Sequence, residues 1–196
     1  MRGWTPKEGT GSIVQSVAFV CTANRARSPF AAALLRRHLA GSGIEVESFG
    51  TLDQAGTPAL LPAVRSARAF GVDLTAHRSR RIGSRTLIAH DLVIGFEAFH
   101  VATAVVDGGA SGSRTFLLTE LAEMLLEGDE ITRGRQRSLA ELVADLDARR
   151  QTRQQVPRPL ADPVGASDRR FFELYHEIDR LVAIVASRLF SGQEPH

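Results

Sequence analysis

The sequence predicts an α/β fold, a single domain in which a four-stranded parallel sheet is flanked by helices on both faces. Three observations lead to this prediction. Short apolar segments alternate with longer amphipathic segments along the chain, which is typical of strand–helix units. Proline and glycine lie where the amphipathic segments should begin and end. The length of 196 residues, with 43% hydrophobic content, suits one domain with a full core.

The first predicted unit is strand–helix–strand. Residues 16–20 form a continuous apolar run, which is typical of a strand buried on both faces. Residues 29–40 read as a helix with apolar positions on one side. Residues 44–49 alternate between apolar and polar side chains, which indicates a strand nearer the edge of the sheet. The two strands should therefore be parallel and joined by a right-handed crossover.

The rest of the chain repeats this alternation. Thr57 and Pro58 are typical of a helix start, and Gly71 is typical of its end. Ser84 and Thr119 are predicted to cap two further helices. The remaining predicted elements are strands at 91–95 and 114–118, and helices at 84–90, 97–106, 119–126, 138–149 and 167–189.

The composition restricts where the protein is expected to be located and which partners it is expected to bind. Residues 1–15 are predicted to be a flexible arm, 16–190 the domain and 191–196 a short tail. The chain shows neither the apolar run of a signal peptide nor that of a membrane span, so we expect a cytoplasmic protein without a membrane partner. The single cysteine excludes an internal disulfide and a cysteine-rich zinc site. Arginine clusters at 78–85 and 133–137 lack interleaved aromatic residues, so no nucleic-acid partner is expected.

The segment after the first strand carries the clearest chemistry. Cys21 follows the strand, Arg27 comes six residues later, and Ser28 and Pro29 open the helix. Backbone N–H groups and the positive end of a helix bind a tetrahedral oxyanion, and an arginine adds a bidentate clamp. The same field stabilises a thiolate. The segment therefore predicts a nucleophile and a phosphate cradle in one loop. A cysteine that merely ends a core strand is the alternative, and it does not explain the loop.

A second chemical group is expected late in the chain. Transfer of a phosphoryl group to a cysteine leaves an oxyanion that needs a proton, so a carboxylic acid should lie nearby. Asp162 is the candidate, because it lies between prolines in a stiffened loop that leads into the last predicted helix. An Asp-Pro pair also initiates turns, and the residues alone leave both interpretations open.

Four segments together resemble one known family. Residues 20–29 (VCTANRARSP) are similar to the phosphate loop of the low-molecular-weight protein tyrosine phosphatases, and Asp162-Pro163 is similar to their late Asp-Pro motif. Residues 48–51 (SFGT) and 71–80 (GVDLTAHRSR) match family landmarks in order and approximate spacing. The resemblance implies a phosphocysteine intermediate and no metal or other cofactor.

The resemblance also assigns roles to single residues. Cys21 would be the nucleophile, and Arg27 would grip two phosphate oxygens. Asp162 would protonate the leaving group and then deprotonate the attacking water. Ser28 would donate its hydroxyl to the thiolate. The loop residues implied in substrate binding are Thr22, Ala23, Asn24, Arg25, Ala26 and Ser28.

Supporting residues are implied as well. Asn24 is expected to hold the loop in a strained, left-handed turn, which asparagine tolerates better than most residues. In the family this asparagine belongs to a hydrogen-bond network with a serine and a histidine, which align here with Ser48 and His77. On the residues alone, Ser48 could simply end a strand and His77 could be an ordinary surface histidine.

The chain departs from the family pattern around the same loop. Ala23 stands where glycine is usual, and Ala26 replaces a second cysteine that can trap the oxidised nucleophile as a disulfide. Arg25 occupies the rim, where the family often has an apolar residue. It would favour acidic surroundings and repel a cationic substrate, or it is a solvated side chain. Val164 and Gly165 follow Asp162 where animal members have two tyrosines, so a strong aromatic wall is not implied.

The predicted function is hydrolysis of phosphotyrosine on protein, with phosphorylated protein as partner and inorganic phosphate or another oxyanion as a ligand of the loop. Two alternatives stay open, namely a protein arginine phosphatase, which the rim arginine disfavours, and a non-catalytic phosphate-binding regulatory module. Arsenate reduction through a relay of cysteines within one chain is excluded by the single cysteine.

Overall fold

The computed structural model describes residues 15–128 and 137–190. The predicted arm, apart from Gln15, and the tail at 191–196 lie outside the described residues, as do residues 133–136 of the second arginine cluster. The backbone carbonyl of Gln15 accepts a hydrogen bond from the Glu45 N–H at 2.9 Å, so this last residue of the predicted arm continues the pairing of the first two strands.

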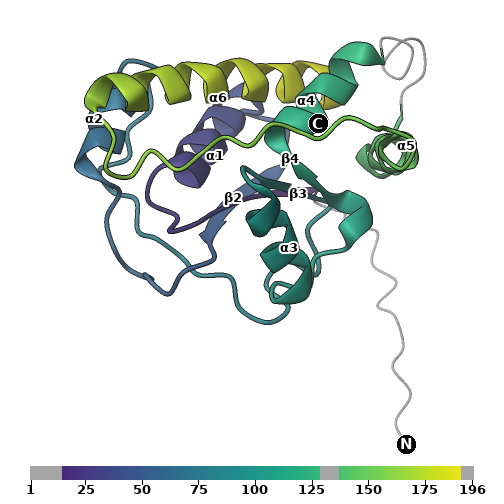
Figure 1. The fold of residues 1–196 in the computed structure, drawn as a ribbon, viewed down its shortest axis with the longest axis horizontal. Coiled ribbons are helices and arrows are strands. Elements are labelled where there is room, and N and C mark those ends of the chain that lie inside the picture. The colour runs from purple at the N-terminus through teal and green to yellow at the C-terminus, as the bar shows by residue number, and fades with distance from the viewer. Residues whose placement is uncertain (1–14, 129–136, 191–196) are drawn as a thin grey trace, which may run out of the picture.

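Four parallel strands form the centre of the molecule (Figure 1), as predicted. They are β1 (Ser16–Cys21), β2 (Glu45–Gly50), β3 (Leu92–Gly95) and β4 (Thr115–Leu117), in the order β2-β1-β3-β4. The chain leaves β1 for β2 on one side and continues to β3 on the other, so the order reverses beside β1. Open α/β sheets bind ligands beyond the carboxyl ends of their strands at such a reversal. The fold therefore directs a ligand to the end of β1, where Cys21 lies.

Helices cover both faces of the sheet, and alternation along β1 shows why. Val17 and Phe19 point into the larger core, which α6 shares with the first helices of the chain, whereas Ala18 and Val20 point into a smaller core beneath α3. In Figure 1, α1, α4 and α6 lie on one side of the strands and α3 on the other. The helices are α1 (Arg27–His38), α2 (Leu61–Arg68), α3 (Ala98–Val106), α4 (Leu118–Glu127), α5 (Leu139–Arg150) and α6 (Asp168–Leu189), with a 3-10 turn at Gly112–Arg114.

The last helix is tied directly to the loop that follows β1. The Tyr175 ring of α6 stacks on Phe30 of α1, with ring centroids 3.8 Å apart, and its hydroxyl donates a hydrogen bond to the Ala26 carbonyl at 3.0 Å. Both rings are fully buried. A buried hydrogen bond of this kind contributes about 1 kcal/mol beyond the packing of the ring. The C-terminal helix thus holds the end of the loop in place.

The predicted start of the second helix is wrong. Thr57 and Pro58 do not begin it, because α2 starts at Leu61 and the second proline, Pro62, occupies its second position. Thr57 N–H instead donates to the Ser79 hydroxyl at 3.0 Å, and Pro58 pairs with the chain at residue 78 in an antiparallel bridge. Tertiary pairing with a distant segment therefore overrides a plausible local start signal.

The helix predicted at 84–90 is absent and is replaced by turns. Arg85 has φ 70°, a left-handed conformation that interrupts helical geometry. The cause is tertiary, because the backbone of Gly109 packs against Arg85 and the Leu87 N–H bonds to the Gly108 carbonyl at 2.9 Å.

Two other helix starts also shift. Thr119 does not cap α4 but lies inside it and donates its hydroxyl to the Arg158 carbonyl at 2.6 Å. Helix α1 begins two residues before Pro29, which still lies in the first turn, where a missing N–H breaks no bond. Among the described helices, none is both long and apolar enough to cross a membrane.

Candidate active site

The loop between β1 and α1 leads into a helix start that no side chain of the described residues caps. The residue before α1, Ala26, makes no side-chain cap, and the first turn of the helix contains no acidic residue. The N–H groups of this turn and the positive end of the helix dipole are therefore available to an anion. The loop lies where the sheet order reverses, so fold and local chemistry indicate the same anion site.

Cys21 and Ser28 meet at this site, although seven positions separate them. The Cys21 sulfur lies 3.0 Å from the Ser28 hydroxyl oxygen, and both side chains are buried. The same hydroxyl lies 3.1 Å from the Phe49 carbonyl. Its single hydrogen can serve either acceptor, and a thiolate would attract it more strongly than a carbonyl does. Ser28 is thus placed to stabilise a negative charge on Cys21.

Asn24 organises the loop from inside. Its φ is 54°, the left-handed conformation predicted for it, and its side chain is fully buried. The amide nitrogen donates to the hydroxyls of Ser28 and Ser48, both at 2.9 Å, and the amide oxygen accepts from the Arg80 N–H at 2.8 Å. Ser48 thus does more than end a strand, because its hydroxyl is one of the contacts that hold Asn24.

His77 completes this network from another loop. Its Nε2 lies 2.7 Å from the Asn24 carbonyl, which can only accept, so Nε2 carries the proton. Burial lowers the pKa of His77, the neighbouring positive charges of Arg80 and Arg36 act in the same direction, and the bond to Asn24 opposes them. A neutral, partly buried His77 therefore fixes the loop backbone and is not a free surface histidine.

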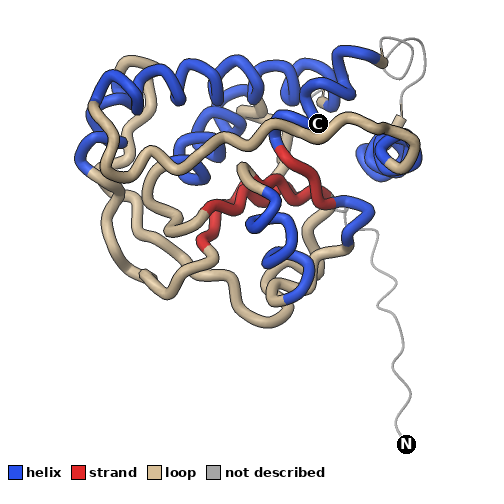
Figure 2. The backbone as a smooth tube through the Cα atoms, in the orientation of Figure 1, coloured by secondary structure: helices blue, strands red, loops and turns tan. Residues whose placement is uncertain are grey.

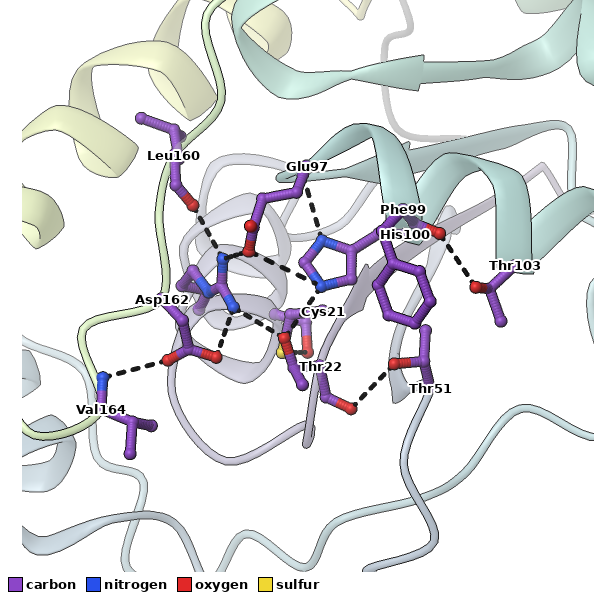
Figure 3. A network of polar contacts seen from close by, with 12 residues as sticks. Cys21, Thr22, Thr51, Glu97, Phe99, His100, Thr103, Leu160, Asp162 and Val164 are labelled. Atoms are coloured by element: carbon purple, nitrogen blue, oxygen red, sulfur yellow. Dashed lines mark hydrogen bonds and ion pairs between the residues drawn. The ribbon is translucent and has the colours of Figure 1, made fainter.

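The Arg27 guanidinium is bonded to four residues of a second network. Figure 3 shows these partners, Thr22, Glu97, Leu160 and Asp162. The Arg27 side chain is 1% exposed. Nη1 donates to the Glu97 carboxylate and to the Leu160 carbonyl, the latter at 2.7 Å, and Nη2 donates to the Thr22 hydroxyl at 2.9 Å. The Nε–H has no acceptor among the residues that the structure describes. The guanidinium is therefore held on one side and keeps a donor for an anion on the other.

Asp162 lies against the same guanidinium. Its Oδ2 accepts from Arg27 Nη2 at 2.6 Å, and its Oδ1 accepts from the Val164 N–H at 3.1 Å (Figure 3). The loop between α5 and α6 runs across the molecule as one long stretch without regular structure (Figure 2). The Leu160 N–H anchors it to the Phe96 carbonyl at 2.8 Å. Asp162 can therefore both initiate a turn and serve as the candidate acid, because the turn holds its carboxylate at the site.

The residues that depart from the family pattern are accommodated in different ways. Ala23 has no positive φ, so its side chain is tolerated there. Ala26 is buried where a second thiol would otherwise lie. Arg25 is partly buried, with Nε donating to the Pro58 carbonyl at 2.8 Å, so it lies along the neighbouring loop and is not simply solvated.

Sequence reasoning missed two residues of this site, Glu97 and His100. The sequence pattern places Glu97 only at the start of a predicted helix and does not single out His100. Glu97 is the residue that caps the start of α3 and His100 lies in its first turn, shortly after β3. His100 Nε2 lies 3.0 Å from the Thr22 hydroxyl. The available signal was their position, since carboxylate and imidazole groups that follow a parallel strand face the ligand edge of the sheet.

Gly50 shows how tightly the loop is packed. A Cβ at this position would lie 2.7 Å from the Ala23 carbonyl carbon and 2.8 Å from the Asn24 nitrogen. We expect Gly50→Ala to displace the loop backbone and to lower turnover of an aryl phosphate about 100-fold or more, because small misplacements of a reacting group cost that much.

The matched control for Gly50→Ala is Gly112→Ala. A Cβ at Gly112 meets nothing within 4 Å, so kinetics and melting temperature should stay near those of the wild type. Equal kinetic constants for the two variants would show that the close approach at Gly50 has no role in the site.

Fold and site together define a class, an α/β protein in which a buried cysteine lies in the strand–turn–helix loop that forms the candidate anion site. The family model described as low molecular weight phosphotyrosine protein phosphatase matches residues 16–151. The chain belongs to this family, as its sequence motifs predict. The match ends before Asp162, whose position rests on the structure.

Individual relatives agree with this assignment. Etp of Escherichia coli K12, named a low molecular weight protein-tyrosine-phosphatase, is 31% identical over 108 residues, 55% of this chain and 72% of its own length. Tyrosine phosphatase Wzb of Escherichia coli K30, solved with sulphate, has a similar fold (TM-score 0.66, 21% identity, 90% of this chain and 99% of that one). So has the YwlE arginine phosphatase of Geobacillus stearothermophilus (TM-score 0.68, 22% identity, 91% and 95%).

Proposed function

We propose that this protein is a cysteine-dependent phosphatase that hydrolyses phosphotyrosine on protein through a phosphocysteine intermediate. The observation that carries the proposal is the convergence of Cys21, Arg27 and Asp162 at the N-terminus of α1. A nucleophile, a charge clamp and a proton donor are the groups that a phosphoryl transfer through a covalent intermediate needs.

Substrate binding begins with the dianionic phosphoryl group. The backbone N–H groups at the start of α1 and the Nε–H of Arg27 donate to its oxygens. A phosphate oxygen competes with Asp162 for Arg27 Nη2, where the carboxylate now lies at 2.6 Å. Binding of phosphate thus frees Asp162 to face the leaving group. Glu97 and the Leu160 carbonyl hold Nη1 throughout, so the guanidinium keeps its orientation.

In the first chemical step the Cys21 thiolate attacks phosphorus. Asp162, once released from Arg27, first takes up a proton from solvent. The S–P bond then forms, the bond from phosphorus to the tyrosine oxygen breaks, and Asp162 gives this proton to that oxygen. Arg27 and the loop N–H groups stabilise the charge on the three equatorial oxygens. The products of the step are a free tyrosine side chain and phosphocysteine.

In the second step a water molecule attacks the phosphocysteine. Asp162, now a carboxylate, takes a proton from the water as the O–P bond forms and the S–P bond breaks. The Ser28 hydroxyl, 3.0 Å from the sulfur, donates to the departing thiolate and makes it a better leaving group. Inorganic phosphate leaves, and Cys21 and Asp162 return to their starting forms.

Phosphotyrosine is favoured over phosphoarginine by the charge at the rim. Arg25 belongs to the loop between β1 and α1, although its Nε donates to the Pro58 carbonyl of the neighbouring loop. A substrate guanidinium that approaches this rim would meet a like charge. The 31% identical relative Etp is named a tyrosine phosphatase, which supports the same choice.

The test compares phosphotyrosine and phosphoarginine peptides of one sequence on wild-type protein, with a chelator present. We expect phosphate release from the phosphotyrosine peptide at a kcat/KM at least about tenfold higher, the size of effect that one like-charge contact produces. A preference for phosphoarginine would make the protein an arginine phosphatase. Turnover of neither peptide, with inorganic phosphate still bound, would identify a regulatory phosphate-binding module.

A further inference from the structure

A buried histidine lies next to the site without a part in the two chemical steps. His100 of α3 is 0% exposed. Its Nδ1 accepts a hydrogen bond from the Glu97 N–H at 3.1 Å, so the ring proton must lie on Nε2. Burial lowers the pKa of His100 to about 4, and the positive charge of Arg27 acts in the same direction. The ring is therefore neutral near pH 7 and is a single, fixed donor.

This donor points at the phosphate loop. His100 Nε2 lies 3.0 Å from the Thr22 hydroxyl oxygen, which also accepts from Arg27 Nη2 at 2.9 Å (Figure 3). A hydroxyl oxygen has two lone pairs, and these two donors occupy both. The Thr22 hydroxyl is consequently held between the imidazole and the guanidinium in one orientation.

The remaining hydrogen of Thr22 has no acceptor in the described part of the chain. Thr22 is partly exposed and belongs to the anion loop, so this hydrogen is available to an oxygen of a bound phosphoryl group. Without the His100 donor, the hydroxyl could rotate and its hydrogen could point elsewhere. The arrangement thus removes rotational freedom before the substrate arrives.

We propose that His100 is a positioning residue that acts through Thr22, fixing Arg27 Nη2 and directing the Thr22 hydroxyl hydrogen into the anion site. The inference rests on the proposed phosphatase function, which it deepens. The start of α3 and its capping residue therefore stabilise the loop in two ways, since Glu97 holds Nη1 of Arg27 and His100 holds Nη2 through Thr22.

A purely structural role would use the other ring nitrogen. The bond from the Glu97 N–H to Nδ1 caps the start of α3 and needs no contact with Thr22. The two roles can be separated, because an asparagine amide mimics the Nδ1 position of histidine and a glutamine amide mimics Nε2. His100→Asn can keep the cap and loses the donor, whereas His100→Gln loses the cap and can keep the donor.

The experiment measures kcat/KM for an aryl phosphate and the dissociation constant of inorganic phosphate. We expect His100→Asn to lower kcat/KM about 10- to 100-fold, the effect of losing a hydrogen bond to a charged network. His100→Gln should recover a large part of this loss. In a Thr22→Val background, His100→Asn should cause no further loss, because the hydroxyl through which His100 acts is gone.

His90→Asn is the matched control. His90 is also buried, but its Nε2 contacts Glu47 on the edge strand and, among the described residues, it makes no hydrogen bond with residues 21–28. The variant His90→Asn should leave kcat/KM and the dissociation constant of inorganic phosphate unchanged. The melting temperature of each variant shows whether it is folded.

Three results would overturn the inference. The first is a higher kcat/KM for His100→Asn than for His100→Gln, and the second is a further loss of kcat/KM when His100→Asn is added to Thr22→Val. The third is that kcat/KM and the dissociation constant of phosphate change only in proportion to the melting temperature. If the wild type hydrolyses no aryl phosphate, the proposed function has failed. The affinity for inorganic phosphate, compared across the same variants, then decides the positioning role alone.

Discussion

Replacing Cys21 by serine should reduce phosphate release to the background of the buffer. A serine hydroxyl is far less nucleophilic than a thiolate, and no other cysteine in the chain can replace it. Loss of the nucleophile in an enzyme with a covalent intermediate costs on the order of 10⁶-fold in kcat. The side chain is 2% exposed and differs by one atom, so the fold should be retained.

The measurement is steady-state hydrolysis of an aryl phosphate with chelator present, together with binding of inorganic phosphate. Binding should survive in Cys21→Ser, because the loop N–H groups and Arg27 remain. Mass spectrometry of acid-quenched wild-type protein should show one added phosphoryl group on Cys21. Turnover of Cys21→Ser at the wild-type rate would disprove the covalent mechanism.

Asp162→Asn should produce the second-largest loss, and its size should depend on the leaving group. An amide cannot deliver a proton, so turnover of an unactivated phenyl phosphate should fall about 10²- to 10⁴-fold, the usual contribution of a general acid. With a strongly acidic phenol as leaving group the loss should be much smaller, since that oxygen leaves without a proton.

The same variant should bind inorganic phosphate at least as tightly as the wild type. Asp162 carries a negative charge and holds Arg27 Nη2 at 2.6 Å, so it competes with the anion in the free protein. Kinetic constants for a series of substituted phenyl phosphates, with phosphate as a competitive inhibitor, measure both effects. Equal losses for all leaving groups would mean that Asp162 only shapes the turn between its flanking prolines.

The fold was predictable because its main signals are local. The apolar run at β1 and the alternation in β2 follow from side-chain burial in a sheet. The helix predicted at 138–149 forms as α5, and the Ser138 hydroxyl caps its start by accepting from the Glu141 N–H at 3.3 Å. The errors at Thr57 and Ser84 occurred where a distant segment supplies the deciding contact. A local start signal there is real but weaker than the tertiary pairing.

The sequence by itself determined the anion loop, because Cys21, Arg27 and Ser28 lie within one strand–turn–helix whose geometry is local, and it singled out Asp162 by the prolines around it. Only the tertiary structure decided what surrounds Arg27. Glu97 and His100 follow β3, and Asp162 follows α5, so no spacing in the sequence links them to residue 27. They meet because the carboxyl ends of parallel strands lie at one edge of the sheet, where loops distant in sequence converge.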